Sequence, residues 1–311
     1  MPLHPQAKKF IDRISAETGG TQRPLGVAEA RDSLRALLGG GGRDIAPAKV
    51  RELTIPGGDG QAMQARVYQP VSSRELPVLL FLHGGGWIAG DLVSHDPLCR
   101  DLMLASGCVI VSIEYRLAPE HKFPAAPRDC YSALQWVVDH GADFGWDSTR
   151  VAIGGDSAGG NLAAAVTQLA RTERGPQLAF QLLVYPVTDY AFETQSYQQF
   201  ADGYLLTREA MISHWQHYLS DPDAGRNPLA SPLRAESLAG LPPALVITAE
   251  CDPLRDEGER YAERLRDAGI KVELRRYDGM LHAFFSLGSH FDQGREAVAY
   301  AGEVVRRALS S

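Results

Sequence analysis

The stretch Gly155-Asp156-Ser157-Ala158-Gly159 stands between the apolar residues 151–153 and the helix-forming residues 161–165. A strand that turns sharply into a helix leaves no room for a Cβ two residues before and two residues after the turn residue, so glycine is needed there. The pattern therefore predicts a nucleophile elbow, with the Ser157 hydroxyl exposed above the edge of a sheet. The first N–H groups of the helix would lie beside this hydroxyl and stabilise a developing negative charge.

A second glycine-rich motif, His83-Gly84-Gly85-Gly86-Trp87, directly follows the apolar residues 78–82. Consecutive glycines after a strand let backbone N–H groups turn toward one point, as an oxyanion requires. We therefore predict an oxyanion hole formed by the N–H groups of Gly85, Gly86 and Ala158. The plain alternative is an ordinary glycine turn. A phosphate-binding loop is disfavoured because no Gly-Lys-Ser or Gly-Lys-Thr ending follows.

A serine nucleophile needs a histidine base and an orienting carboxylate, which in this architecture follow the elbow in the order acid, then histidine. Asp252 follows the strand-like residues 245–249, and His282 stands in a loop after the next predicted strand. We expect these two residues to complete a triad. Glu250 and Asp256 are rivals for the acid, but Glu250 is still close to the strand pattern, and Asp256 is better explained as a charge in the first turn of the next helix.

The other histidines have plainer interpretations. His83 precedes the elbow and is suited to orienting the glycine loop through its ring. His214 and His217, three residues apart on a predicted helix, resemble half a metal site, but no cysteine or acidic residue stands at ligand spacing. A solvated or pocket-lining pair is favoured, and we predict no metal site. The remaining histidines are expected to be structural, exposed or terminal: His4, His95, His121, His140 and His290.

These motifs resemble those of the hormone-sensitive-lipase-like carboxylesterases, the bacterial family IV branch of the α/β-hydrolase superfamily. The likeness extends to Tyr-Arg-Leu-Ala-Pro-Glu at 115–120 and Asp-Pro-Leu-Arg-Asp-Glu-Gly at 252–258, and so spans nearly the whole chain. It implies an α/β-hydrolase fold and hydrolysis of short- to medium-chain acyl esters through an acyl-enzyme, without a metal or organic cofactor. The small-molecule partner would then be the ester substrate.

The resemblance assigns the same site residues as the reasoning above. It implies Ser157 as the nucleophile, Asp252 and His282 as its partners, and the N–H groups of the glycine loop and of Ala158 as the oxyanion hole. The chain departs from the family pattern at two positions. Cys251 stands where an aromatic residue often precedes the acid, and Ala283 stands where a glycine often follows the histidine. We expect these departures to affect local packing more than the chemistry.

Strand-like and helix-like segments alternate along most of the chain, which implies an α/β fold with a mostly parallel sheet and helices on both faces. An antiparallel hairpin of residues 50–55 and 63–68 is predicted before strands at 76–82 and 109–113. Later elements are expected as strands at 181–185, 245–249 and 272–277, and as helices at 130–139, 160–171, 256–268 and 296–309.

Two stretches do not fit this alternation, residues 1–48 and an insertion at about 186–232. We expect both to form a helical cap over a catalytic domain of residues 49–311. The glycines at 39–42 are expected to end a helix and connect it flexibly to the sheet. Within the insertion we predict an acyl pocket lined by Tyr204, Leu205, Met211 and Trp215. The alternative is that these side chains only pack the cap onto the core.

Composition narrows the function classes. The chain has 311 residues, 44% hydrophobic content and a net charge of −7, which disfavours nucleic acid and anionic membrane surfaces as partners. No apolar run approaches the ~20 residues of a membrane span, and the first residues lack a secretory pattern. Four isolated cysteines are expected to be reduced thiols. Together these features predict a cytoplasmic enzyme.

Some alternatives stay open. An amidase, peptidase or lactonase could use the same triad, because leaving-group preference depends on pocket shape. A non-catalytic small-molecule receptor could share the fold, although the intact order of Ser157, Asp252 and His282 argues against it. Members of the family that the chain resembles often pair through the edge of the sheet near the C-terminal strands, so the resemblance implies that residues 272–277 could be such an edge strand in a homodimer. Arg275 and Arg276 could equally guard the edge of a monomer.

Overall fold

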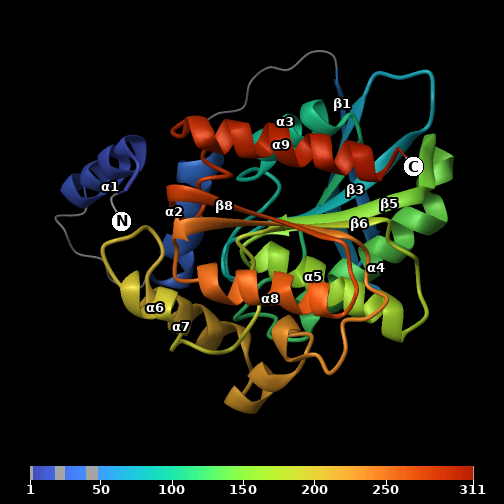
Figure 1. Ribbon diagram of the computed structural model, residues 1–311. Helices are drawn as coiled ribbons and strands as arrows, with labels where there is room; N and C mark the ends of the chain where they lie inside the picture. The colour runs from blue at the N-terminus through green and yellow to red at the C-terminus, as the bar shows by residue number, and fades with distance from the viewer. Residues whose placement is uncertain (1–2, 18–24, 40–47, 311) are drawn as a thin grey trace.

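The computed structural model describes residues 3–17, 25–39 and 48–310. Its centre is an eight-stranded sheet with the strand order β1-β2-β4-β3-β5-β6-β7-β8, and helices cover both faces (Figure 1). The strands are β1 (Ala48–Pro56), β2 (Ala62–Pro70), β3 (Leu76–Leu82), β4 (Val109–Ile113), β5 (Trp146–Asp156), β6 (Phe180–Val184), β7 (Ala244–Cys251) and β8 (Val272–Leu281).

The predicted hairpin and the parallel sheet are both confirmed. β1 and β2 pair antiparallel from Ala48↔Pro70 to Pro56↔Ala62, and β2 pairs antiparallel with β4. Every later pairing, from β3 with β4 to β7 with β8, is parallel. The carboxyl ends of β3, β5, β7 and β8 therefore meet at one edge of the sheet, and this is where sites of open α/β sheets lie.

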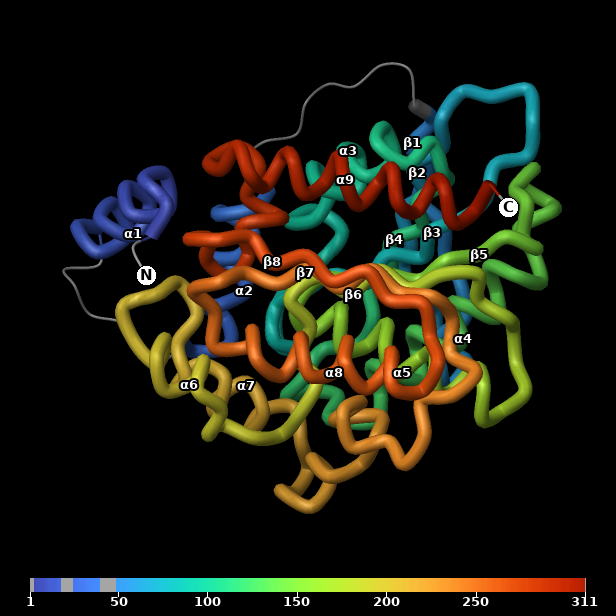
Figure 2. The backbone as a smooth tube through the Cα atoms, in the orientation of Figure 1, coloured from blue at the N-terminus to red at the C-terminus, as the bar shows by residue number. Residues whose placement is uncertain are grey.

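Alternate side chains of the central strands enter two separate cores. Val78, Leu80 and Leu82 of β3 pack in one core, and Leu79 and Phe81 pack in the other. Because both faces are covered, the strand is an unbroken apolar run. In Figures 1 and 2, α3 (Asp96–Ser106) and α9 (Asp292–Ala308) cover one face, and α4 (Ala125–His140), α5 (Ala158–Thr172) and α8 (Arg255–Asp267) cover the other.

Some helices begin earlier than predicted. α4 starts at Ala125 rather than 130, and α9 starts at Asp292 rather than 296. In α4, Pro127 lies in the first turn, where its missing N–H removes no helical hydrogen bond. The remaining short segments are the 3₁₀ helices η2 (Gly141–Phe144), η3 (Pro222–Arg226) and η4 (Pro232–Arg234).

The segments predicted as cap contain four α-helices in the described residues: α1 (Pro5–Glu17), α2 (Val27–Leu38), α6 (Gln195–Gln199) and α7 (Arg208–Tyr218). α2 is tied to the loop after β3, where Arg31 Nε donates to the Ile88 carbonyl at 2.8 Å and Arg35 pairs with Asp91. α1 instead packs near β8, where the His4 N–H donates to the Gly279 carbonyl at 3.1 Å.

The proposed domain boundaries stay a prediction. α2 ends at Leu38, and Gly39 follows as its C-cap with φ −76°. The rest of the glycine run, 40–42, and the boundary placed near residue 48 fall on or beside residues 40–47, which lie outside the described residues.

Candidate active site

Ser157 occupies the turn between β5 and α5, as the elbow motif predicted. Its backbone is strained, with φ 56° and ψ −118°, a conformation that non-glycine residues rarely adopt outside functional sites. A Cβ on Gly159 would overlap the Leu82 carbonyl oxygen, and one on Gly155 would overlap the backbone of Gly159. The requirement for glycine on both sides of Ser157 is therefore confirmed.

His282 links Ser157 to Asp252. Its Nε2 lies 2.9 Å from Ser157 Oγ, and its Nδ1 lies 2.7 Å from Asp252 Oδ2. Asp252 is fully buried, whereas Ser157 and His282 each keep 8% of their surface exposed. A buried carboxylate accepts from Nδ1–H, which leaves the Nε2 lone pair facing the serine hydroxyl. The three side chains are thus arranged for nucleophilic catalysis by serine.

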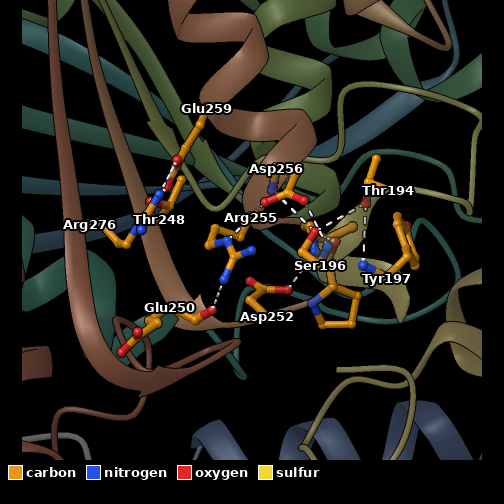
Figure 3. A network of polar contacts seen from close by, with 12 residues as sticks. Thr194, Ser196, Tyr197, Thr248, Glu250, Asp252, Arg255, Asp256, Glu259 and Arg276 are labelled. Carbon is orange, nitrogen blue, oxygen red and sulfur yellow. Dashed lines mark hydrogen bonds and ion pairs between the residues drawn. The ribbon is translucent and has the colours of Figure 1, made fainter. Parts of the chain in front are cut away.

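The two rival acids point elsewhere. Glu250 Oε2 accepts from the Gly279 N–H at 2.6 Å. Asp256 Oδ2 accepts from the Ser196 N–H at 2.7 Å (Figure 3). The pairing of β7 with β8 is irregular between Ala249 and Cys251, so the strand ends in a local break of register. Such an irregularity re-aims the side chains that follow it. In the described part of the chain, Asp252 alone of the three acids hydrogen-bonds to His282.

A polar network fixes the loop that carries Asp252 (Figure 3). Ser196 of α6 donates from its Oγ to the Pro253 carbonyl at 2.6 Å, and Arg255 donates to the Glu250 carbonyl at 3.1 Å. Asp252 itself accepts from the Leu254 N–H at 2.9 Å. α6 therefore holds the backbone that carries Asp252. Sequence reasoning missed Ser196, because no local pattern connects it to a loop so distant in the chain.

The glycine loop lies beside the elbow. Gly85 and Gly86 have φ values of 116° and 61°. Within the described residues, neither their N–H groups nor that of Ala158, the first residue of α5, donates to another group of the protein. Gly84 is bound to the elbow, since its N–H donates to Asp156 Oδ1 at 2.9 Å. The role of these three N–H groups as an oxyanion hole stays a prediction.

His83 orients this loop, as expected. Its Nδ1 lies 2.8 Å from the Gly84 carbonyl, and its ring stacks on Tyr115 at a centroid distance of 4.2 Å. Burial, and then the nearby His95, lower the pKa of His83 to about 4. The ring is therefore neutral at neutral pH, and its Nδ1–H donates to the carbonyl.

Asp156 and His95 form a buried pair that sequence reasoning missed. His95 Nε2 lies 3.4 Å from Asp156 Oδ1. Burial raises the pKa of Asp156, but the attraction and hydrogen bond of His95 and the hydrogen bond from Gly84 outweigh it, so the pKa is lowered overall. The charged carboxylate thus ties the glycine loop to the elbow. The position of Asp156 inside the elbow motif was the one available signal.

Ala283, one of the two departures from the family pattern, has a left-handed backbone with φ 67°. An L-residue with a Cβ is strained there by about 1–2 kcal/mol. We expect Ala283→Gly to raise the free energy of unfolding by about 1 kcal/mol, and calorimetry to show a Tm increase of about 1.5 °C. Ala268→Gly, at φ −81°, is the control and should give no gain. An unchanged or lower Tm for Ala283→Gly would contradict the strain.

The predicted pocket residues lie in two places. Met211 and Trp215 of α7 are buried, and Trp215 packs against Trp87 of the glycine loop at a centroid distance of 4.5 Å. The rings of Tyr204 and Phe200 lie 4.9 Å apart between centroids, and Leu205 is partly buried against the core on the opposite face of the sheet, which contains Leu79 and Phe81. The contacts of Trp215 match the packing alternative. That these side chains also line the acyl pocket stays a prediction.

The described residues contain no cluster of three or more histidine, cysteine, aspartate or glutamate side chains able to hold a metal ion. The four cysteines are buried free thiols, as predicted. None of the helices in the described part of the chain is both long enough and apolar enough to span a membrane.

Comparison with known proteins identifies the family of this chain. A family model described as α/β hydrolase fold matches residues 79–286. The carboxylic ester hydrolase LipN of Mycobacterium tuberculosis is 47% identical over 262 residues, covering 82% of this chain and 69% of LipN. An ethyl acetate hydrolase of Pseudomonas putida is 33% identical, covering 99% of this chain and all of that protein.

Solved structures give the same result. A thermostable esterase from Pseudomonas putida superposes with a TM-score of 0.93 at 42% identity, covering 99% of this chain and 98% of that one. An esterase from Pyrobaculum calidifontis superposes with a TM-score of 0.92 at 38% identity over the full length of both chains. The chain belongs to the α/β-hydrolase fold family and, within it, to the hormone-sensitive-lipase-like carboxylic ester hydrolases, which sets the receptor alternative aside.

Proposed function

We propose that this enzyme hydrolyses short- to medium-chain acyl esters with Ser157 as nucleophile, His282 as general base and Asp252 as the acid that orients it. The observation that carries the proposal is the continuous hydrogen-bond chain, 2.9 Å from serine to histidine and 2.7 Å from histidine to aspartate. The series of hydrogen bonds runs from the Ser157 hydroxyl to the buried Asp252 carboxylate, so Nε2 of His282 is free to take the serine proton while Nδ1 stays hydrogen-bonded to Asp252.

The reaction follows from these positions. Asp252 holds the proton on Nδ1 of His282, and Nε2 takes the Ser157 proton as Oγ attacks the ester carbonyl carbon. The carbonyl oxygen becomes an oxyanion and moves toward the N–H groups of Gly85, Gly86 and Ala158. His282 then gives its proton to the leaving alcohol, and an acyl-enzyme remains. Water deprotonated by the same nitrogen attacks the acyl carbon and releases the acid.

The proposal is tested by hydrolysis of p-nitrophenyl esters from acetate to palmitate, together with labelling by diethyl p-nitrophenyl phosphate. We expect turnover concentrated at short and medium acyl chains, and one phosphoryl group per chain on the peptide that contains Ser157. Label on a different serine would overturn the assignment of the nucleophile. A preference for palmitate would overturn the acyl range. A p-nitroanilide and a lactone measured beside the esters would reveal amidase or lactonase activity.

Met211 provides a test of the acyl pocket. If its buried side chain limits the pocket, Met211→Ala should accept longer chains, because space for one methylene is worth about 1–3 kcal/mol in kcat/KM. We expect the ratio of kcat/KM for the octanoate to that for the butyrate to rise about tenfold. Met103→Ala, a matched truncation in the opposite core, is the control. An unchanged chain-length profile in Met211→Ala would contradict a lining role.

Two further features belong to this proposal. β8 lies at an edge of the sheet, which agrees with the expectation that residues 272–277 form an edge strand. Arg275 and Arg276 pair with Glu296 and Glu259 of the same chain, each at 2.5 Å, so the arginines are engaged within the chain. An open edge supports a homodimer through β8. The homodimer and the cytoplasmic location both stay predictions.

A further inference from the structure

His214 of α7 lies directly against the glycine loop. A methyl group placed on Gly86 would stand only 2.5 Å from His214 Nδ1 and 2.6 Å from its Cγ, so this edge of the ring rests on the Gly86 Cα. Two neighbouring residues of α7 also pack against the glycine loop and hold the helix beside it. Tyr218 stacks on Trp87 with parallel rings 4.2 Å apart, and Trp215 contacts the same tryptophan.

The two ring nitrogens of His214 have different surroundings. Nδ1 is buried and has no hydrogen-bond partner in the described part of the chain. The side chain as a whole is partly exposed, and Nε2 is not among its buried atoms. Nδ1 faces the Cα–H of Gly86, so an N–H at this position would meet another hydrogen, whereas an unprotonated Nδ1 can accept a weak contact from the Cα–H. The neutral ring therefore carries its proton on Nε2, on the exposed side.

His214 also stands close to the base. Burial, and then the charges of His282 and His217, lower the pKa of His214 to about 4. At neutral pH the His214 ring is therefore uncharged and has one N–H to donate. It neither competes with His282 for protons nor repels the protonated form of His282. The ring contacts Gly86, whose N–H is assigned to the oxyanion, and Nε2 lies on the side of the ring opposite the edge that rests on the Gly86 Cα.

We propose that His214 is a specificity-determining residue that donates a hydrogen bond from Nε2 to an acceptor oxygen of the substrate close to the ester group. The preferred substrates are then esters with an ether, hydroxyl or carbonyl oxygen two to four atoms from the reacting carbonyl carbon, over alkyl esters of the same shape. This inference rests on the proposed function of the Ser157 site. A donor placed for such an oxygen discriminates against analogues that lack it.

Isosteric substrate pairs test the proposal. In the acyl half, p-nitrophenyl methoxyacetate is compared with the butyrate; in the alcohol half, 2-methoxyethyl acetate is compared with butyl acetate. For each variant, the readout is the ratio of kcat/KM for the two members of a pair, divided by the same ratio for the wild type. This division cancels the difference in intrinsic reactivity between the two esters.

His214→Phe keeps an aromatic ring but has no hydrogen-bond donor. His214→Gln carries an amide nitrogen near the position of Nε2, whereas His214→Asn carries it near that of Nδ1. His217→Phe is the control on the same helix.

We expect His214→Phe and His214→Asn to lower the normalised ratio about 5- to 10-fold in one of the two pairs, as loss of one hydrogen bond does. The affected pair identifies the half of the substrate that His214 contacts. His214→Gln should restore most of the ratio, and His217→Phe should leave it unchanged. Equal losses on both members of each pair would mean that His214 only supports the glycine loop, which overturns the proposal while the esterase site stands. Wild-type protein that cleaves none of the four esters would overturn both.

Discussion

Ser157→Ala is expected to lower kcat for p-nitrophenyl butyrate by a factor on the order of 10⁶. The substitution removes the side-chain oxygen that His282 Nε2 approaches at 2.9 Å, so no acyl-enzyme can form. Substrate binding should be largely kept, because the cap and the glycine loop do not depend on this hydroxyl. The residual rate would come from the oxyanion donors and from binding alone. Active-site-titrated steady-state kinetics measure the fall.

A serine elsewhere separates this effect from damage to the fold. Ser132 donates to the Pro56 carbonyl at 2.9 Å and is distant from the elbow in the sequence. Ser132→Ala should keep activity within about twofold of the wild type, since surface changes away from a site have small effects. Thermal unfolding of both variants should show a native fold. Turnover by Ser157→Ala above one per cent of the wild type would remove Ser157 from the role of nucleophile.

Asp252→Asn is expected to lower kcat about 10⁴-fold, with little effect on folding. Aspartate accepts the Nδ1 proton of His282 at 2.7 Å, whereas an asparagine amide would donate to Nδ1 and drive the proton to Nε2. The histidine would then present N–H to Ser157 and could not accept its proton. The loss arises from the tautomer rather than from size, because asparagine has nearly the same shape as aspartate. The same kinetic assay measures it.

The rival acids are the natural controls for this prediction. Asp256→Asn and Glu250→Gln should each keep kcat within about tenfold of the wild type, because their carboxylates accept from the backbone N–H groups of Ser196 and Gly279 rather than from His282. A 10⁴-fold loss in Glu250→Gln together with an active Asp252→Asn would transfer the role of the acid to Glu250.

The outline of the site was predictable because it depends on local rules. The turn at Ser157 needs glycine on both sides, and the sequence supplies it. Asp252 and His282 follow predicted strands, and the carboxyl ends of parallel strands meet at one edge of a sheet. Proximity of serine, acid and histidine is therefore a consequence of strand order and direction, both of which can be inferred from alternating apolar segments.

Which of the neighbouring acids contacts His282 was harder to predict from the sequence. Glu250 and Asp252 are two residues apart and would share one face of a regular strand. The irregular register between Ala249 and Cys251 ends that regularity, and the Gly279 N–H then takes the Glu250 carboxylate. A break of register depends on the partner strand, so it cannot be derived from the residues of β7 alone.

The sequence by itself determined the fold class and predicted the nucleophile and the order of its partners, because each depends on a local turn or on the period of a strand. Only the tertiary structure decided that Ser196 holds the loop of Asp252 and that His214 rests on Gly86. Both contacts join the cap insertion to loops of the sheet that are far away in the chain. Local patterns carry no information on such contacts, since they arise when the cap packs against the sheet and buries its aromatic side chains.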